Sequence, residues 1–329
     1  MKNEPFTYSI EKTPNRKYTV ITLSYTPTNE KNSPITVRIA PTLGSNMFQF
    51  RVGNHDIIYH EAELLASCGF TGNFVLFPTP NRVEGSTYEW EGKRIVLKKR
   101  GKFVLLHGLV FDEPWQWAKP IVAKTYVSVK TYISIGKKSR LFNAFPFPCR
   151  LTLEYRLTAG GIRIHYTVQN LGSESLPYGF ALHPYFSRLS GDDETYITIP
   201  AKSWMESPND TLLPNGTLID VSGKPYNVNT PRPVGKLSLD HVYTDLKPGK
   251  FATIDYRSLK LKVRLETSKD FTHMVVYTGH KKAVCIENQT CSTDAHNLWA
   301  RGFKKESHLM VIPKGKKHTG HITYKIEEY

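Results

Sequence analysis

The stretch Leu151-Thr-Leu-Glu-Tyr-Arg-Leu157, the link Ala159-Gly-Gly161 and the run Ile162-Arg-Ile-His-Tyr-Thr-Val168 decide the fold class. Large apolar or aromatic residues occupy every second position in both runs, which is the period of a β-strand with one buried face. A glycine-bearing link between two alternating runs is typical of an antiparallel hairpin. The segment therefore predicts two paired strands that bury one face in the core.

The same period recurs along the chain, whereas helical periodicity is expected only around Glu61–Cys68. Further expected strands are Tyr18–Tyr25, Ile35–Ile39, Phe103–Leu106, Val127–Ile135, Tyr196–Ile199, Leu259–Leu265, Met274–Tyr277 and Leu309–Ile312. The 22 glycines and 21 prolines punctuate these runs. The pattern predicts an all-β fold, an antiparallel sandwich or barrel rather than alternating βαβ units. Because no repeat or linker divides the chain, residues 1–329 are expected to form a single domain.

The composition is that of a globular protein, with 40% hydrophobic and 22% charged residues. No secretory signal core follows Met1, and no apolar run is long enough to span a membrane. The four cysteines, which form no C-x-x-C pair, favour reduced thiols and a cytoplasmic location. We therefore expect no membrane partner.

The net charge of +15 is unusual and raises the question of an anionic partner. The basic clusters are short and scattered along the chain, and no nucleic-acid-binding motif accompanies them. These clusters are Lys98-Lys99-Arg100, Lys137-Lys138, Lys281-Lys282, Lys304-Lys305 and Lys314–Lys317. We expect a solvated basic surface and no nucleic acid partner, with an anionic partner as the open alternative.

Two ionisable residues stand out as candidates for proton transfer. His183 precedes a proline in Leu182-His-Pro-Tyr-Phe186, so it is expected in extended backbone at a strand end, where its imidazole can act as a general acid. Glu287 ends the apolar run Ala283-Val-Cys-Ile-Glu287, where burial would raise its pKa and make it a useful base. The alternatives are a structural histidine and a glutamate on the solvent face of an edge strand.

Three further segments carry candidate binding groups. Asn81 and Arg82 follow a proline-rich turn, and a guanidinium offers fixed donors to sugar hydroxyls or to anions. His107 ends an apolar run, and Asp240 lies in Leu237-Ser-Leu-Asp240. Each of these residues is weak evidence alone. The chain has no H-E-x-x-H, G-x-S-x-G, P-loop or G-x-G-x-x-G motif, and we expect no metal site.

Taken in order, these segments resemble the aldose 1-epimerase (galactose mutarotase) family. The matching pieces are Asn81-Arg82 with Gly85, Tyr88 and Gly92, then His107-Gly108, Leu182–Phe186, Leu239-Asp240 and Cys285-Ile-Glu287-Asn-Gln. The resemblance implies a large antiparallel β-sandwich that binds a small-molecule sugar on its concave face. It also implies that Glu287 is the general base and His183 the general acid. His107, Asn81, Arg82 and Asp240 then correspond to the groups that hold and polarise the sugar.

The implied reaction opens and recloses the ring of a free aldohexose, and it needs no cofactor because no redox change or group transfer occurs. The acid and the base are expected on opposite sides of the C1–O5 bond. His241 departs from the acidic residue or asparagine that often follows the family's aspartate. Three alternatives remain. The +15 charge favours a hexose-6-phosphate 1-epimerase, a non-catalytic carbohydrate-binding protein could share the fold, and a nucleic-acid-binding protein would explain the charge alone. We expect a monomer or a weak homodimer.

Overall fold

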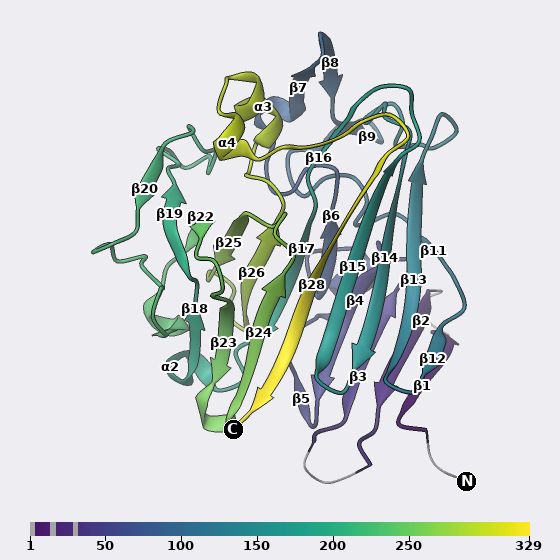
Figure 1. The fold of residues 1–329 in the computed structure, drawn as a ribbon, viewed down its shortest axis with the longest axis vertical. Coiled ribbons are helices and arrows are strands. Elements are labelled where there is room, and N and C mark those ends of the chain that lie inside the picture. The colour runs from purple at the N-terminus through teal and green to yellow at the C-terminus, as the bar shows by residue number, and fades with distance from the viewer. Residues whose placement is uncertain (1–3, 14–17, 29–31) are drawn as a thin grey trace.

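The computed structural model describes residues 4–13, 18–28 and 32–329, and antiparallel sheets are its main secondary structure (Figure 1). The largest sheet has ten strands and runs across the whole molecule. Its order is β11 (Gln116–Trp117), β13 (Tyr126–Ile135), β14 (Cys149–Thr158), β15 (Gly161–Asn170), β28 (Lys317–Glu328), β24 (Leu261–Thr267), β23 (Ala252–Tyr256), β18 (Thr195–Thr198) and β21 (Arg232–Pro233), with β12 (Ile121–Ala123) beside β13.

Two smaller sheets make up the opposing layer. The seven-stranded sheet has the order β20 (Leu218–Asp220), β19 (Ala201–Met205), β22 (Asp240–Leu246), β25 (His273–Tyr277), β26 (Ala283–Gln289), β17 (Ala181–Ser187) and β6 (Asn73–Leu76). The five-stranded sheet has the order β1 (Phe6–Lys12), β2 (Thr19–Tyr25), β3 (Ile35–Ala40), β4 (Asn46–Val52) and β5 (His55–Asp56). Two-stranded pairs are β7 (Thr87–Trp90) with β8 (Lys93–Val96), β9 (Lys98–Lys99) with β10 (Lys102–Phe103), and β16 (Leu176–Tyr178) with β27 (Met310–Ile312).

The predicted hairpin is β14 and β15, paired from Cys149 opposite Asn170 to Thr158 opposite Gly161. All eight residues that were predicted to point inward are at most 1% exposed. A Cβ on Gly161, at φ +129°, would lie 2.1 Å from the Tyr324 carbonyl oxygen, so glycine lets β28 approach the hairpin closely. The predicted all-β sandwich is therefore confirmed.

One apolar cluster fills the space between the layers, with members from all three larger sheets. Each sheet contributes every second residue to it, as Val37, Tyr155 and Ile286 illustrate. The other face of the seven-stranded sheet carries a separate small cluster built on Phe74, Tyr185 and Cys285. This second face is free of the main core and so is available for a site.

The expectation of one helical segment is wrong, and one expected strand is mostly absent. The expected helix is α1 (Ala62–Ala66), but α2 (Gly191–Glu194), α3 (Ala295–Ala300) and α4 (Lys304–Ser307) occur as well, together with short 3₁₀ turns at Glu84–Ser86, Val234–Lys236 and Arg257–Leu259. Helices of four to six residues are too short to show a 3.6-residue period. Of the predicted strand Phe103–Leu106, only Phe103 lies in a strand, because the chain then turns toward the site as a loop.

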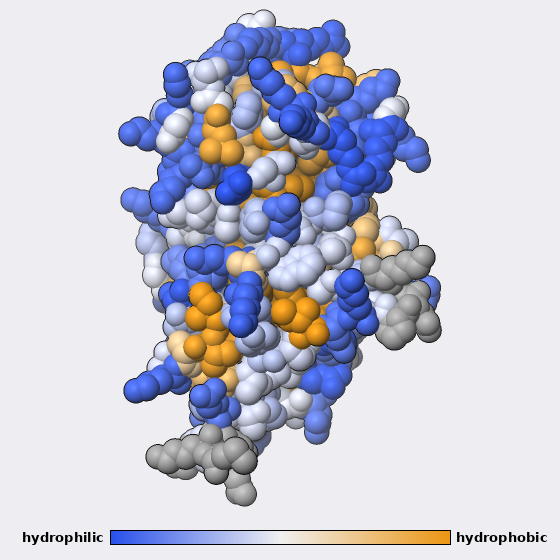
Figure 2. All heavy atoms as spheres, turned by 90° about the vertical axis from the view of Figure 1, so that its right-hand side faces the viewer, coloured by the Kyte–Doolittle hydropathy of each residue, from blue (hydrophilic) through white to orange (hydrophobic). Residues whose placement is uncertain are grey.

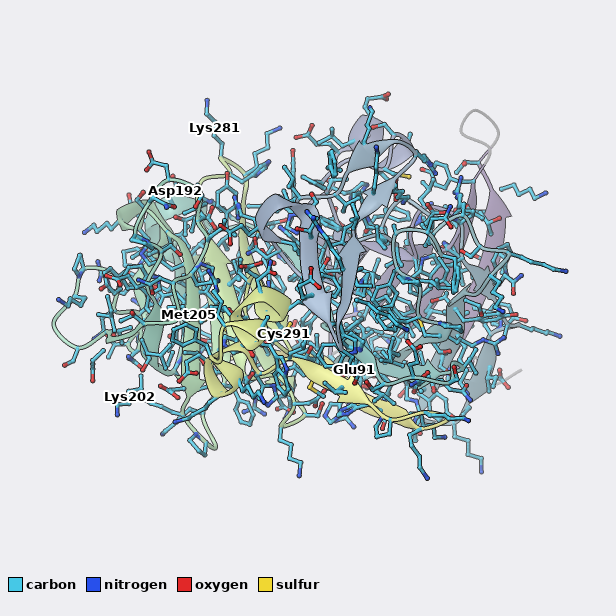
Figure 3. The ribbon with its side chains drawn as sticks, turned by 90° about the horizontal axis from the view of Figure 1, so that it is seen from above. Glu91, Asp192, Lys202, Met205, Lys281 and Cys291 are labelled. Carbon is cyan, nitrogen blue, oxygen red and sulfur yellow. The ribbon has the colours of Figure 1, made fainter. Side chains whose placement is uncertain are left out.

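Helix α3 covers one end of the second face, and α4 follows it in the chain. Leu298 of α3 packs with Met205, Val242 and Val275 of the seven-stranded sheet, and Figure 3 shows Met205 beside this helical segment. Within the part of the chain that the structure describes, no helix is long and apolar enough to traverse a bilayer. On the side formed by β11–β13, Figure 2 shows hydrophilic surface with hydrophobic patches between. Ile121 of β12 is one of the exposed apolar residues.

Candidate active site

Two central strands of the seven-stranded sheet bring the candidate acid and base together. His183 lies in β17 and Glu287 in the adjacent β26, and the register of the flanking pairs places them directly opposite each other. His183 Nε2 is 3.2 Å from Glu287 Oε1. Because Glu287 is 2% exposed and β26 has a strand on each side, the alternative of a solvent-facing residue on an edge strand is wrong. His183 is extended as predicted, but it lies inside β17 rather than at its end.

Burial determines the protonation of this pair. It raises the pKa of Glu287 to about 8, with a further increase from the nearby Asp240 carboxylate and opposition from Gln289 and Arg82. It lowers the pKa of His183 to about 3. Near neutral pH the pair therefore holds one proton that it can give up. The N–H hydrogen of the neutral imidazole is not counted here. A carboxyl group whose pKa lies near the working pH is suited to proton transfer.

Aromatic rings fix the orientation of the His183 imidazole. Phe74 of β6 pairs with His183 and stacks on it, with ring centroids 4.6 Å apart, and Tyr185 stacks on it at 5.0 Å. His107 meets the edge of the same imidazole at 4.9 Å. Burial, His183 and Arg82 together hold the pKa of His107 well below its ordinary value, so His107 is a neutral hydrogen-bonding group.

The polar rim of the site consists of Asn81, Arg82 and Asp240. Arg82 Nη1 donates to Asn81 Oδ1 at 2.9 Å, and Arg82 Nη2 lies 4.0 Å from Asp240 Oδ2 at the start of β22. Both charged side chains are about one-third exposed, in contrast to the buried Glu287. The charges of Arg82 and Asp240 also influence the pKa of Glu287, so the polar rim and the buried His183–Glu287 pair belong to one site.

Backbone hydrogen bonds tie together the two loops that supply these groups. The amide of His107 donates to the Asn81 carbonyl at 2.8 Å, and the amide of Leu109 donates to the Phe77 carbonyl at 2.8 Å. A Cβ on Gly108, at φ +73°, would lie only 2.4 Å from that same Phe77 oxygen. The glycine after His107 is therefore required for the loop to pack against the end of β6.

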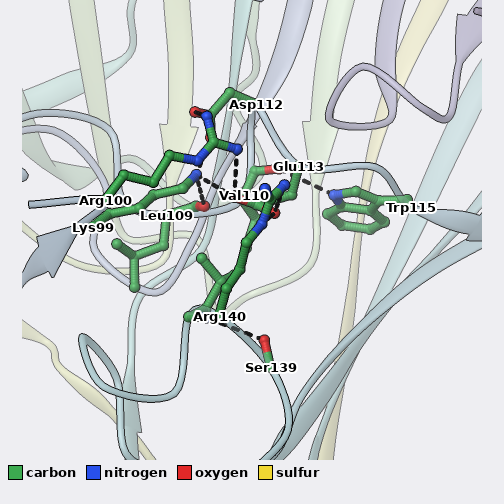
Figure 4. A network of polar contacts seen from close by, with 10 residues as sticks. Lys99, Arg100, Leu109, Val110, Asp112, Glu113, Trp115, Ser139 and Arg140 are labelled. Atoms are coloured by element: carbon green, nitrogen blue, oxygen red, sulfur yellow. Dashed lines mark hydrogen bonds and ion pairs between the residues drawn. The ribbon is translucent and has the colours of Figure 1, made fainter.

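A buried ion network anchors the far side of the His107 loop (Figure 4). Lys99 Nζ donates to the Leu109 carbonyl at 2.8 Å and pairs with Asp112 and with Glu113, the latter at 2.6 Å. Arg140 also donates to Glu113, at 2.6 Å. The first basic cluster of the sequence is thus partly structural, because Lys99 is buried in this network.

The structure brings all six predicted site residues together, from five strands or loops that are separate in sequence. Sequence reasoning missed Phe74 and Gln289. Gln289 Nε2 donates to Glu287 Oε2 at 3.1 Å, and its position two residues after Glu287 could have placed it on the same strand face. Phe74 lies in a four-residue strand that is buried on both faces and so shows no alternation.

Among the described residues, no group of three or more His, Cys, Asp or Glu side chains is placed to hold a metal ion.

Comparison with known proteins places the chain in a family. The family model described as aldose 1-epimerase matches residues 24–325. An uncharacterized protein of Escherichia coli K12, YihR, is 25% identical over 292 residues, which cover 84% of this chain and 86% of YihR. A second uncharacterized protein of the same organism, YphB, is 28% identical over 123 residues, or 37% of each chain.

Solved structures share the fold over nearly the full length. A galactose mutarotase-like protein from Clostridium acetobutylicum superposes with a TM-score of 0.84 at 21% identity and covers 99% of this chain and 100% of its own. A galactose 1-epimerase from Lactobacillus acidophilus superposes with a TM-score of 0.76 at 15% identity, with 98% of each chain covered. At these identities the likeness shows a common fold.

Proposed function

Since the chain belongs to the aldose 1-epimerase family, we propose that it interconverts the α and β anomers of free aldohexoses through the His183–Glu287 pair. The observation that carries the proposal is the 3.2 Å contact between imidazole and carboxyl, buried beneath a polar rim. Ring opening removes a proton from the O1 hydroxyl and delivers one to O5. O1 and O5 are both bonded to C1 and so lie close together. The neighbouring His183 and Glu287 side chains can therefore each reach one of these oxygens if the two side chains move slightly apart.

The single proton of the pair matches what the reaction requires. When it resides on His183, Glu287 is a carboxylate that can accept the O1 proton while the imidazolium donates to O5. The C1–O5 bond breaks and a C1 carbonyl forms. The proton has then moved from His183 to Glu287 by way of the sugar. Rotation about the C1–C2 bond and the reverse transfers close the other anomer and restore the pair, so no cofactor takes part.

This proposal departs from the expected arrangement of acid and base on opposite sides of the C1–O5 bond. The two groups approach from one sheet face, on adjacent strands, rather than from facing walls. His107, neutral and next to His183, would donate to the oxygen that gains charge. Arg82, Asn81 and Asp240 would hold the sugar hydroxyls and so fix its orientation.

Free sugars are preferred to sugar phosphates in this proposal because cations are sparse near the pair. Of the Lys281-Lys282 cluster, Lys281 projects away from the molecule in Figure 3, and Lys282 lies over the Tyr59 ring at 5.6 Å. The Arg188 guanidinium already donates hydrogen bonds to the Thr278 and Ala283 carbonyls. A non-catalytic binding protein would gain nothing from a buried carboxyl that is costly to ionise.

A cytoplasmic location is part of the proposal, supported by four cysteines that form no disulfide.

The test is to follow anomer interconversion by polarimetry for glucose, galactose, xylose and glucose 6-phosphate. We expect kcat/KM to be highest for a free hexose. A value at least about tenfold higher for glucose 6-phosphate would make the phosphate ester the substrate. No acceleration of any sugar by folded enzyme would favour the binding protein.

A further inference from the structure

A cavity lies on the opposite face of the seven-stranded sheet from the His183–Glu287 pair. It has a volume of about 530 Å³ and is lined by residues of β22, β25 and β26 from the seven-stranded sheet and of β23 and β24 from the ten-stranded sheet. The β22–β23 turn and α4 complete its walls. Its size falls in the range of small-molecule sites.

The rim of this cavity is cationic. Lys247, Lys250, Lys269 and Lys305 line it from three separate segments, and all four are exposed. Within the described residues, none of these ammonium groups has an ion-pair partner, unlike Lys99. The one lining carboxylate, Asp245, already accepts a hydrogen bond from Ser203 Oγ at 2.7 Å. Four unpaired ammonium groups around one opening favour an anion with more than one charge.

The floor of the cavity contains a buried amide without a partner. Asn288 is 2% exposed, and neither its Oδ1 nor its Nδ2 has a hydrogen-bond partner among the described residues. A buried amide left unpaired is destabilising, so such groups are normally satisfied by protein, water or ligand. Strand alternation points Asn288 away from Glu287 and into this cavity.

The cavity has two parts, a charged part at the four lysines and an uncharged part around Asn288. Phe271, Met274 and Leu265 supply apolar surface next to Asn288. His308 Nδ1 donates to the Thr290 carbonyl at 2.8 Å, which leaves Nε2 as its free ring nitrogen. A ligand suited to both parts has an anionic group at the lysines and a neutral polar body over the amide.

We propose that this cavity binds a small phosphate ester, with its phosphate group at Lys247, Lys250, Lys269 and Lys305 and its neutral polyol body hydrogen-bonded to Asn288. The site is separate from the sugar site, because β26 lies between them and presents Glu287 and Asn288 to opposite faces. It accounts for part of the excess of basic residues in a protein whose proposed substrate is uncharged.

The experiment measures binding of sorbitol 6-phosphate, which has no anomeric carbon, by isothermal titration calorimetry. We compare the wild-type protein with Lys269→Glu/Lys305→Glu and with Lys137→Glu/Lys138→Glu. The control pair has the same charge change on exposed lysines at another cavity. We expect the first variant to bind at least about tenfold more weakly and the control to bind as the wild type does.

Two further arms locate the ligand. Arg82→Ala, in the rim of the sugar site, should leave the affinity unchanged. Asn288→Leu should weaken sorbitol 6-phosphate but not inorganic phosphate. The proposal is overturned if the wild-type protein shows no binding at millimolar ester, if both lysine variants lose affinity equally, or if Arg82→Ala abolishes binding. Equal affinities for inorganic phosphate and the ester would refute the role of Asn288.

Discussion

His183 of β17 and Glu287 of β26 lie directly opposite each other in adjacent strands, with Nε2 and Oε1 3.2 Å apart. Burial disfavours a charge on either group, so a pair that shares one proton and carries no net charge is the stable arrangement. Adding or removing a proton creates a buried charge. This relationship is the source of three of the predictions below.

Glu287→Gln keeps the shape of the side chain but cannot accept a proton. We expect kcat to fall by at least about 10²-fold with little change in KM, because the proton transfer occurs only in the transition state. His183→Asn should show a similar loss. Glu154→Gln is the control, since Glu154 lies on β14 far from the site, and it should keep wild-type kinetics. A folded Glu287→Gln enzyme with more than a tenth of wild-type kcat would refute the assignment.

The pH dependence of kcat/KM should follow the single proton of the pair. Above the pKa of Glu287, about 8, the pair loses this proton and the acid is gone. Below the pKa of His183, about 3, a second proton occupies the base. We therefore expect a flat profile between about pH 5 and 7 and a fall of about tenfold per unit well above pH 8. An acidic limb near pH 6 in steady-state rates would contradict this order of pKa values.

Thermal stability should show the same titration. The folded state raises the pKa of Glu287 from 4.5 to about 8, so it binds the proton more tightly than the unfolded chain. This contribution to stability is full below about pH 4.5 and is lost as the pH rises through about 8. Glu287→Gln lacks the titration. Its Tm relative to the wild type should therefore increase from pH 6 to 9 in differential scanning fluorimetry, and a constant difference would contradict the raised pKa.

Gly108→Ala should destabilise the protein and impair catalysis together. The new methyl group would lie 2.4 Å from the Phe77 carbonyl oxygen at a positive φ, and it would displace the loop that holds His107. We expect a loss of about 1–3 kcal/mol in unfolding free energy and a lower kcat. Gly101→Ala is the matched control, because Gly101 has a similar φ of +79° but no atom within 4 Å of its added Cβ. Equal losses in both variants would show that the contact with Phe77 is unimportant.

Arg82→Lys tests the rim of the site. A lysine cannot contact Asn81 and Asp240 at the same time with a planar fork of donors, so we expect a higher KM and a smaller effect on kcat. Stability should hardly change, because the Arg82–Asp240 pair is one-third exposed and such pairs contribute at most about 1 kcal/mol. Arg163→Lys, on the outer face of β15, serves as the kinetic control. An unchanged KM in Arg82→Lys would remove Arg82 from the binding site.

Local sequence was sufficient for the strands that bury one face. In the β14–β15 hairpin, the period of two specifies the inward residues regardless of the rest of the chain, because side chains of a strand alternate between two faces. The order of short motifs was also sufficient to indicate the family. Segments without a period were not predictable, such as α3, whose six residues are stabilised by contacts of Leu298 with the seven-stranded sheet.

Only the tertiary structure decided how the candidate residues meet. His183 and Glu287 are about a hundred residues apart, and their contact follows from the register between β17 and β26, which is set by packing across the whole sheet. The burial that sets their pKa values, and the orphaned amide of Asn288 beside lysines from three segments, are likewise properties of assembled layers. The local sequence determines on which face of a strand each side chain lies. Long-range packing determines which other residues contact that face.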